Sequence, residues 1–332
     1  MQDPFDERRI ATLRKRVSLL GAVFEFESGS ARLLRLVDQA YKGLAVQHLS
    51  RTAPRLKLRL QLTDGGRFAA SEPPPLHTHG GAGLLLGTID AANFAALCPA
   101  TRTGLVACSR ELLRFPYHAR YELLEFAVFT LGSRAQGLVP LHAGCVALQG
   151  RGALLIGDSG AGKSTLALHC LLAGLDFVAE DAVFVSPKTL RAEGVANFLH
   201  LREDSLRFID SQAMATRIRR SPVIRRRSGE AKFEIDMRRG GYRLAAAPPV
   251  LAALVLVSKK PARGGALLRP LSAAQTLAKL AASQPYAAGP PGLRALARQA
   301  AHLPAFELRR GVHPAQSARA LRKLLEWGQA LA

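Results

Sequence analysis

The sequence predicts an α/β protein with a smaller α+β module over residues 1–115 and a larger domain over residues 116–332. In the larger domain, an apolar run over 153–156 leads through a glycine-rich segment into a helix-periodic stretch over 165–173. Further apolar runs of strand length follow it. The module before it shows strand-like segments around one amphipathic helix pattern. A chain of 332 residues is long enough for two such domains.

The N-terminal module carries strand and helix patterns but no catalytic motif. Its predicted strands are 17–26, 56–62, 83–86 and 104–109, and its predicted helix is 31–44. His77 and His79 are only two residues apart, which is a weak metal signal and more typical of a solvated loop. We interpret this module as a substrate-recognition or oligomerisation unit.

The larger domain is predicted to begin with a helix over 118–133, followed by a hairpin that feeds the glycine-rich segment. The hairpin joins residues 141–148 to 153–156 through Gly150–Gly152. Later strands are predicted over 176–179, 182–185, 233–237, 250–257 and 306–309, and helices over 271–283 and 314–327. The run 250–257 is apolar enough to be a central strand.

Composition narrows the class of protein. Hydrophobic residues make up 48% of the chain, which allows a sizeable core. No apolar stretch is long enough to cross a bilayer, and the N-terminus lacks an apolar signal core, so we expect a cytoplasmic protein with no membrane partner. The four cysteines show no zinc spacing, and Cys145 and Cys170 are expected to be buried thiols.

The charge is strongly positive, with Lys+Arg 46 against Asp+Glu 25 and a net charge of +21. Such an excess suits nucleic acid or an acidic partner. No helix-turn-helix, zinc-finger or RNA-binding signature accompanies it, so nucleic acid is not the expected partner. The dense basic run Arg217–Arg227 is either a solvated loop or a clamp for a triphosphate or an acidic substrate segment.

One motif carries most of the functional signal. Residues 157–164, GDSGAGKS, fit the phosphate-loop pattern G-x-x-x-x-G-K-[ST] at every defined position, between a predicted strand and a predicted helix. The glycines let consecutive N–H groups turn toward phosphate oxygens, and the helix dipole adds to their attraction. Lys163 can reach the outer phosphates, and the Ser164 hydroxyl is placed for Mg²⁺. The alternative is a glycine-rich turn that binds nothing, but such a turn would not need the full motif. We therefore expect the chain to bind a nucleoside triphosphate at this loop.

The residues predicted to bind the nucleotide are therefore Gly157, Asp158, Ser159, Gly160, Ala161, Gly162, Lys163, Ser164 and Thr165. A second signal follows the loop helix, where Glu180 and Asp181 interrupt an apolar run. Acidic residues at the end of a buried strand are unfavourable unless they serve a cation or a proton. A carboxylate in this place is suited to orient a hydroxyl for in-line attack, which makes Asp181 the candidate acid/base.

Residues 140–181, with the segments LHAGCVAL, GRGALLIGDSGAGKSTLAL and AGLDFVAED, resemble the catalytic domain of HPr kinase/phosphorylase. Beyond them, to about residue 327, only the order of elements agrees, and the first 115 residues show no clear match. The resemblance implies a phosphate-loop kinase core of the phosphoenolpyruvate-carboxykinase-like type. It also implies an enzyme that uses ATP and Mg²⁺ to phosphorylate a serine of a small carrier protein.

The same resemblance assigns roles by position. Asp181 corresponds to the acid/base that takes the proton from the acceptor serine. His142 corresponds to a catalytic histidine that could hold Asp181 or a phosphate, and Lys163 and Ser164 keep the roles given above. Glu180 stands where the family has a second aspartate.

Two roles stay open within the resemblance. The magnesium-binding glutamate falls near His200 or Glu203, and Glu203 is the preferred candidate. The later catalytic arginine corresponds to Arg238, Arg239 or Arg243, with no choice among them.

The function expected is an ATP- and Mg²⁺-dependent serine kinase acting on a small protein or peptide. Phosphorylase activity is not expected, because Lys260–Gly264 is a poor substitute for the family's phosphorolysis loop. One alternative is a phosphate-loop kinase of a small-metabolite hydroxyl. Another is a non-catalytic nucleotide-binding regulatory protein, against which the pair of Asp181 and His142 argues. The family's hexamers make a homo-oligomer a further expectation.

Overall fold

The computed structural model describes residues 12–47, 49–68, 70, 72–262, 266–284 and 291–327. Residues 263 and 264 of Lys260–Gly264, the poor substitute for a phosphorolysis loop, lie outside the described residues. The chain forms two compact units, the first made of Met1–Lys42 and Leu49–Gln136 and the second of Gly43–His48 and Gly137–Ala332. Neither unit is therefore a single continuous stretch of the chain.

Residues 116–136 lie in the first unit, whereas the sequence predicts that they begin the larger domain. The helical stretch buries Leu123, Leu124, Val128 and Leu131. At Gly132 a side chain would meet the Phe24 ring, since an added Cβ would lie 3.1 Å from it. An apolar helix face indicates that the helix packs against a hydrophobic core, but it does not indicate which core. The sequence pattern therefore could not place the boundary between the two units.

The first unit contains a seven-stranded sheet in the order β1-β2-β3-β7-β6-β5-β4. Its described elements are β1 Leu13–Leu19, β2 Ala22–Ser28, α1 Ala31–Tyr41, β3 Arg55–Thr63, β4 His77–Gly81, β5 Leu84–Asp90, β6 Asn93–Cys98, β7 Thr103–Ser109, the 3₁₀ turn η1 Leu112–Arg114, α2 Pro116–His118, the π-helical segment η2 Ala119–Leu124 and α3 Glu125–Gln136. His77 and His79 lie in the exposed strand β4, so they are not part of a loop. The predictions of a helix over 31–44 and of strands over 56–62, 83–86 and 104–109 are confirmed, with shifted bounds.

The predicted strand over 17–26 is wrong in one respect, because it is two antiparallel strands. The chain reverses at Leu20 and Gly21, whose φ angles are 50° and 71°. A two-residue hairpin turn of type I′ needs positive φ at both positions. Leucine is an unusual residue for the first of them, so the turn is hidden in an apolar run.

The second unit contains a six-stranded sheet in the order β11-β9-β10-β17-β19-β18 and two three-stranded sheets, β13-β12-β8 and β14-β16-β15. Its described elements are β8 Val139–Leu141, β9 Gly144–Leu148, β10 Arg151–Ile156, α4 Lys163–Leu172, β11 Asp176–Ala179, β12 Val183–Val185, β13 Ala192–Gly194, β14 Phe198–Leu201, the 3₁₀ segment η3 Glu203–Phe208, α5 Gln212–Arg219, β15 Val223–Arg225, β16 Ala231–Asp236, β17 Val250–Pro261, β18 Leu268–Pro270, α6 Ala273–Ala282, α7 Pro291–Ala300, β19 Ala305–Arg310 and α8 Pro314–Trp327. The strands and helices predicted for this region are confirmed with shifted bounds, except that the predicted strand over 141–148 is interrupted between β8 and β9. The elements α5, α7, β15 and β18 were not predicted. None of the described helices has both the length and the apolar character to span a bilayer.

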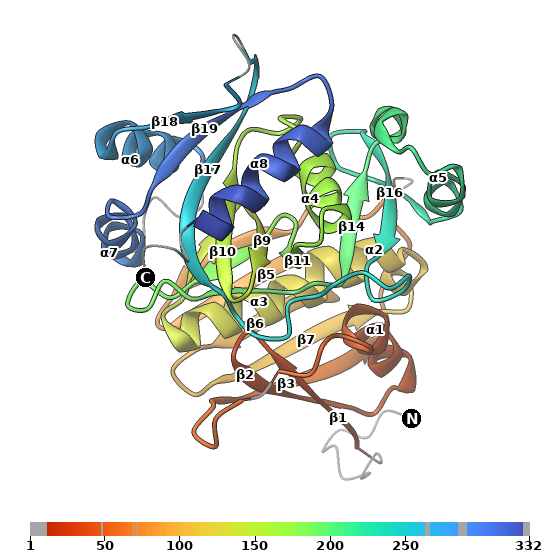
Figure 1. Cartoon of the computed structure of the whole chain (residues 1–332). Coiled ribbons are helices and arrows are strands. Elements are labelled where there is room, and N and C mark those ends of the chain that lie inside the picture. Colours follow the sequence, from red (N-terminus) through yellow and green to blue (C-terminus); the bar gives the residue numbers. More distant parts are fainter. Residues whose placement is uncertain are drawn as a thin grey trace, which may run out of the picture. The chain divides into compact units, whose positions relative to one another are not determined.

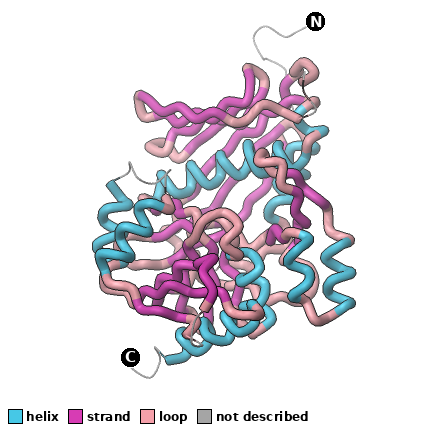
Figure 2. Tube along the Cα trace, turned by 90° about the horizontal axis from the view of Figure 1, so that it is seen from above, coloured by secondary structure: helices cyan, strands magenta, loops and turns pink. Residues whose placement is uncertain are grey.

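The six-stranded sheet is covered on both faces. Successive residues of β10 point to opposite sides, so Leu155 packs with α4 and α8 while Leu154 and Ile156 pack with α6 and α7. Figure 1 shows α4 and α8 lying over one face of this sheet, and Figure 2 shows helices on both sides of the second unit's strands. Because both faces of the sheet are buried, the side chains on both sides of the central strand β17 are apolar. This explains the unbroken apolar run over 250–257.

The cysteines behave as expected from the sequence. Cys145 in β9 and Cys170 in α4 are fully buried free thiols, and burial raises the pKa of the Cys145 thiol to about 12. Cys108 is also a buried free thiol, and Cys98 is partly exposed. The three buried thiols, Cys108, Cys145 and Cys170, are packing residues rather than nucleophiles, because burial raises their pKa and keeps them protonated.

A first prediction concerns the core of the second unit. Phe177 of β11 has no exposed surface and packs in the cluster between the sheet and the helices α4 and α8. Phe177→Ala is expected to lower the free energy of unfolding by about 3–5 kcal/mol, because it leaves a cavity. The measurement is urea unfolding followed by far-ultraviolet circular dichroism. Leu172→Ala is the control, since Leu172 is 48% exposed; a Phe177→Ala loss no larger than that of the control would contradict this view of the core.

Candidate functional site

The glycine-rich loop lies between β10 and α4, as the motif requires. Gly162 has a φ of 101° directly before the first residue of α4, Lys163, a conformation that favours glycine. At Gly157 an added Cβ would lie 2.7 Å from the backbone oxygen of Val257, so the neighbouring strand β17 leaves no room for a side chain there. The loop therefore presents the N-terminus of α4 to a pocket, which suits an anion.

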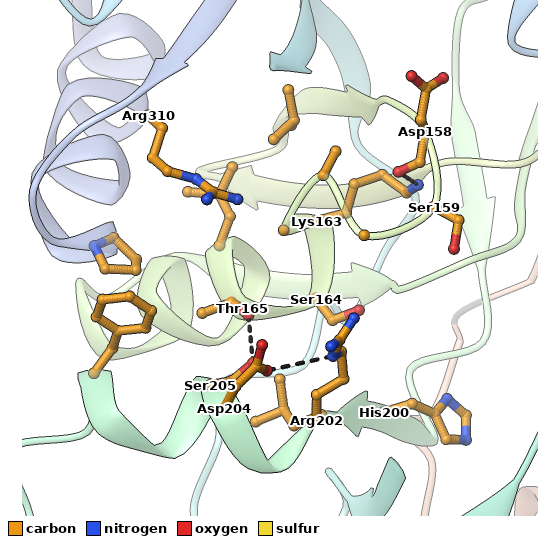
Figure 3. A pocket seen from close by; sticks show the side chains of 18 of the residues that line it. Asp158, Ser159, Lys163, Ser164, Thr165, His200, Arg202, Asp204, Ser205 and Arg310 are labelled. Carbon is orange, nitrogen blue, oxygen red and sulfur yellow. Dashed lines mark hydrogen bonds and ion pairs between the residues drawn. The ribbon is translucent and has the colours of Figure 1, made fainter. Parts of the chain in front are cut away.

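The pocket has a volume of about 550 Å³ and is lined by all the loop residues from Asp158 to Thr165. It lies at the carboxyl ends of β10, β17 and β19, which run parallel to one another. In parallel sheets the ligand commonly binds outside these ends, where loops from several strands converge. Figure 3 shows Lys163 and Ser164 at its centre, with His200 and Arg310 at opposite sides.

Lys163 is almost completely buried, with 7% of its surface exposed. Its ammonium donates hydrogen bonds to the backbone oxygens of Gly157 and, at 3.4 Å, of Asp158. Burial lowers the pKa of Lys163, and the carboxylates of Asp181 and Glu180 oppose that shift. A buried ammonium whose hydrogen bonds within the described part of the chain go to backbone oxygens would gain from negative phosphate oxygens.

Ser164 begins a chain of polar contacts that reaches another sheet. Its hydroxyl donates a short hydrogen bond to Glu180 Oε1. The other carboxylate oxygen of Glu180 accepts from the backbone N–H of His200 at 2.8 Å and lies 2.7 Å from its Nδ1. The His200 Nε2 lies 3.3 Å from Glu234, which faces it in the strand pair β14–β16.

His200 is held in its charged form. Burial alone would lower its pKa, but the negative charge of Glu180 and the hydrogen bonds to Glu180 and Glu234 outweigh burial and raise the pKa of His200 to about 9. The imidazolium therefore balances two carboxylates inside a nearly closed part of the site.

Asp181 pairs with an arginine from the basic run. Arg226 donates to its Oδ2 at 3.0 Å, and the two side chains are 18% and 24% exposed. Burial favours the protonated form of Asp181, but the charges of Arg226, His142, His200 and Lys163 lower its pKa below the ordinary value. Asp181 is thus an ionised hydrogen-bond acceptor that faces the pocket.

His142 lies at the rim of the same pocket and is exposed. Its backbone is fixed by Gln284, whose side chain accepts from the His142 N–H at 2.6 Å and donates to the His142 oxygen at 3.2 Å. Its imidazole makes no hydrogen bond to Asp181 among the contacts of the described residues, although its charge acts on Asp181. The structure therefore brings His142 and Asp181 into one pocket without joining them.

The structure does not bring Glu203 to the loop. Its side chain is 66% exposed and pairs with Arg219 at 3.4 Å, outside the pocket. Strand β14 ends at Leu201 and a 3₁₀ turn begins at Glu203, which directs this side chain outward, whereas His200 lies inside. Of the two residues considered for the metal, His200 is the one at the site.

None of the three arginines predicted from the resemblance lines the pocket. Arg238 forms a pair of hydrogen bonds with Asp236 at 2.7 and 2.9 Å, and Arg239 also pairs with Asp236 at 3.4 Å. Arg243 is bound to Asp176 at 2.8 Å. The arginines that line the pocket are instead Arg202, Arg207, Arg226, Arg309 and Arg310. Of these, Arg226 belongs to the basic run that the sequence left open between a solvated loop and a clamp.

Most of that basic run is ordered structure rather than a loop. Arg217 and Arg219 end α5, Arg225 ends β15, and Arg226 follows at the start of the hairpin turn to β16. Glu234 was missed as well. The alternation of polar and apolar residues in β16 is the only signal that could have placed Glu234 opposite a residue of a partner strand.

The described part of the chain holds no group of three or more His, Cys, Asp or Glu side chains placed to bind a metal ion. Ser164 and Glu180 nevertheless offer two adjacent oxygens beside the loop. Such a pair fits Mg²⁺, because Mg²⁺ keeps several waters and takes its remaining ligands from one or two protein oxygens and from phosphates.

Comparisons with known proteins add little. No protein-family model matches the chain. A search of curated proteins found no match either. Among solved structures, the HPr(Ser) kinase/phosphatase from Coxiella burnetii aligns with 58% of this chain and 96% of its own, at 13% identity and a TM-score of 0.29. At that score the match carries no argument about fold or activity.

A second prediction follows from His200. Its pKa is raised from 6.5 to about 9 in the folded protein, so the folded state holds the proton more tightly than the unfolded state. The stabilisation is therefore complete below pH 6.5 and is lost as the pH rises through about 9. In metal-free buffer, the difference in urea midpoint between wild type and His200→Gln is expected to shrink across that range. His302→Gln, at an exposed histidine, is the control; a His200→Gln difference that stays constant with pH would contradict the assignment.

Proposed function

We propose that this protein is an ATP- and Mg²⁺-dependent serine kinase that phosphorylates a small protein or peptide and lacks phosphorylase activity. The observation that carries the proposal is the meeting of the phosphate loop with an ionised carboxylate in one pocket. Lys163, Ser164 and Asp181 all line it, although Asp181 comes from a different strand end. The resemblance of residues 140–181 to the catalytic domain of HPr kinase/phosphorylase supports the same activity.

The loop would bind the triphosphate. Its backbone N–H groups and the N-terminus of α4 would surround the inner phosphates, and Lys163 would turn from the carbonyls of Gly157 and Asp158 to the outer ones. The Ser164 hydroxyl and Glu180 Oε1 would exchange their mutual hydrogen bond for Mg²⁺. When bound there, Mg²⁺ would neutralise charge on the outer phosphates.

The acceptor serine would approach from the side of Asp181. Its oxygen would attack the outer phosphorus as the bond to the inner phosphate oxygen breaks, giving ADP, while the hydroxyl proton passes to the Asp181 carboxylate. The low pKa of Asp181 fits a role in orienting the hydroxyl, since in a loose transition state the proton leaves late. Arg226 is placed to hold Asp181 and to attract the transferred phosphoryl group.

A third prediction concerns nucleotide affinity. Lys163→Ala removes a charged donor to the outer phosphates and is expected to weaken ATP binding about tenfold to a hundredfold, with loss of nucleotide-dependent activity. Isothermal titration calorimetry with ATP and Mg²⁺ measures the affinity. Lys279→Ala, at an exposed lysine of α6 outside the pocket, is the control for loss of one positive charge. Equal affinities for ATP in wild type and Lys163→Ala would count against the proposed phosphate site.

A fourth prediction tests transfer. Peptides and small proteins from neighbouring genes are incubated with the enzyme, ATP and Mg²⁺ and analysed by mass spectrometry for phosphoserine. Asp181→Asn is expected to bind ATP as wild type does but to transfer phosphate about 10²–10⁴ times more slowly. Asp176→Asn, outside the pocket, is the matched control.

Each result has a defined meaning. A phosphoserine formed by wild type and by Asp176→Asn, but not by Asp181→Asn, identifies the substrate and the role of Asp181 together. Unchanged transfer by Asp181→Asn removes Asp181 from the mechanism. ATP binding with no phosphorylation of any protein or peptide overturns the proposed acceptor and leaves a metabolite kinase or a nucleotide-binding regulatory protein.

A further inference from the structure

We propose that the end of the pocket formed by Arg207, Phe208 and Val312 is the subsite for the base of the bound nucleotide. The inference rests on the proposed function, because it presupposes a triphosphate on the loop. It adds a second recognition site, for a heteroaromatic ring, in a part of the pocket that the phosphate chemistry does not use. All three residues line the pocket.

The direction of the ligand follows from the loop. Lys163 reaches the outer phosphates and Ser164 lies beside Glu180, so the outer end of the triphosphate points toward Asp181, Arg226 and His200. The rest of the nucleotide must leave the loop on the other side. Figure 3 shows that side: Arg310 lies across the loop from His200, beyond the helix that begins at Lys163.

An aromatic platform is built at this far side. Phe208 ends η3 and is half-buried, and the Arg207 guanidinium carbon lies 4.7 Å from the centre of its ring. The ring of His313 packs edge-on against Phe208, with centroids 5.5 Å apart. A base could stack on this arginine–aromatic pair, since both groups are planar and accept any base.

The platform is attached to the helix that carries the loop. His313 also packs edge-on against His169 of α4, with ring centroids 5.1 Å apart. The Nδ1 of His313 accepts a hydrogen bond from the N–H of Ala315 at 3.2 Å, which fixes this ring at the start of α8. The distance between the loop and the platform is therefore set by packed rings, as a rigid two-point site requires.

Val312 gives a second reason for placing a ring here. It lines the pocket, yet 90% of its surface is exposed. It follows Arg310 in the turn between β19 and α8, and the Arg310 guanidinium has no hydrogen bond or ion pair within the described parts of the chain. A nucleotide base has apolar faces and an edge that carries hydrogen-bond acceptors. Val312 could contact a face of the base, and the Arg310 guanidinium could donate to its edge.

The experiment compares ATP with inorganic tripolyphosphate, each with Mg²⁺, by isothermal titration calorimetry. Tripolyphosphate reports on the loop alone, whereas ATP reports on the loop and the base subsite together. Phe208→Ala is expected to weaken ATP binding about tenfold and to change tripolyphosphate binding less than about twofold. Val312→Ser, at an exposed position where folding is not at risk, is expected to act in the same direction with a smaller effect. Val46→Ser, at an exposed valine outside the pocket, is the matched control.

The outcomes separate the two proposals. A selective loss of ATP affinity in Phe208→Ala and Val312→Ser supports the base subsite. If wild type binds tripolyphosphate as tightly as ATP, or if ATP affinity is unchanged in both variants, the base does not lie here although the loop still binds phosphate. If wild type binds neither ligand, the proposed function fails, and the subsite fails with it.

Discussion

The carboxylate of Glu180 is the contact on which the rest of the site depends. It is 5% exposed and accepts from the Ser164 hydroxyl on one oxygen and from His200 on the other. It thereby joins the first turn of α4, the end of β11 and the strand β14. Burying a carboxylate without hydrogen-bond partners is strongly unfavourable. A shift of any of these three elements would remove a partner from Glu180, so the contact stabilises their arrangement. The imidazolium of His200 then extends the network to Glu234 of β16, the strand that follows Arg226 in the chain.

The second constraint is the parallel order of β10, β17 and β19. Because these strands end at the same edge of the sheet, the loop after β10, the end of β17 and the turn after β19 meet around one pocket. The two helical layers that bury the sheet leave this edge as an opening. Side chains from widely separated parts of the chain can therefore contact one ligand. Charged side chains lie at the end of the pocket near Asp181, and aromatic rings lie at the end near Phe208.

The sequence predicted what is local and missed what depends on pairing across the fold. The loop, its strand and its helix are contiguous, so their motif and periodicity were sufficient. The pair of Asp181 and Arg226 spans 45 residues and depends on a hairpin whose position no local pattern states. Glu203 is acidic and lies near the expected place in the linear sequence, which is why the sequence favours it as the metal ligand. The strand β14 ends two residues before it, and at the start of η3 the side chain of Glu203 lies exposed to solvent.

The division of the chain into units has a consequence for how the protein can be built and cut. The segment Gly43–His48 belongs to the second unit although it lies between two parts of the first, so the chain passes from one unit to the other after Lys42, after His48 and after Gln136. Within that segment, Gln47 lies 3.5 Å from Glu193 of the second unit. A truncation at any single point removes part of one unit or leaves a fragment of the other. The two units therefore alternate along the chain, and a fragment that ends at Gln136 carries the whole first unit together with the segment 43–48 of the second.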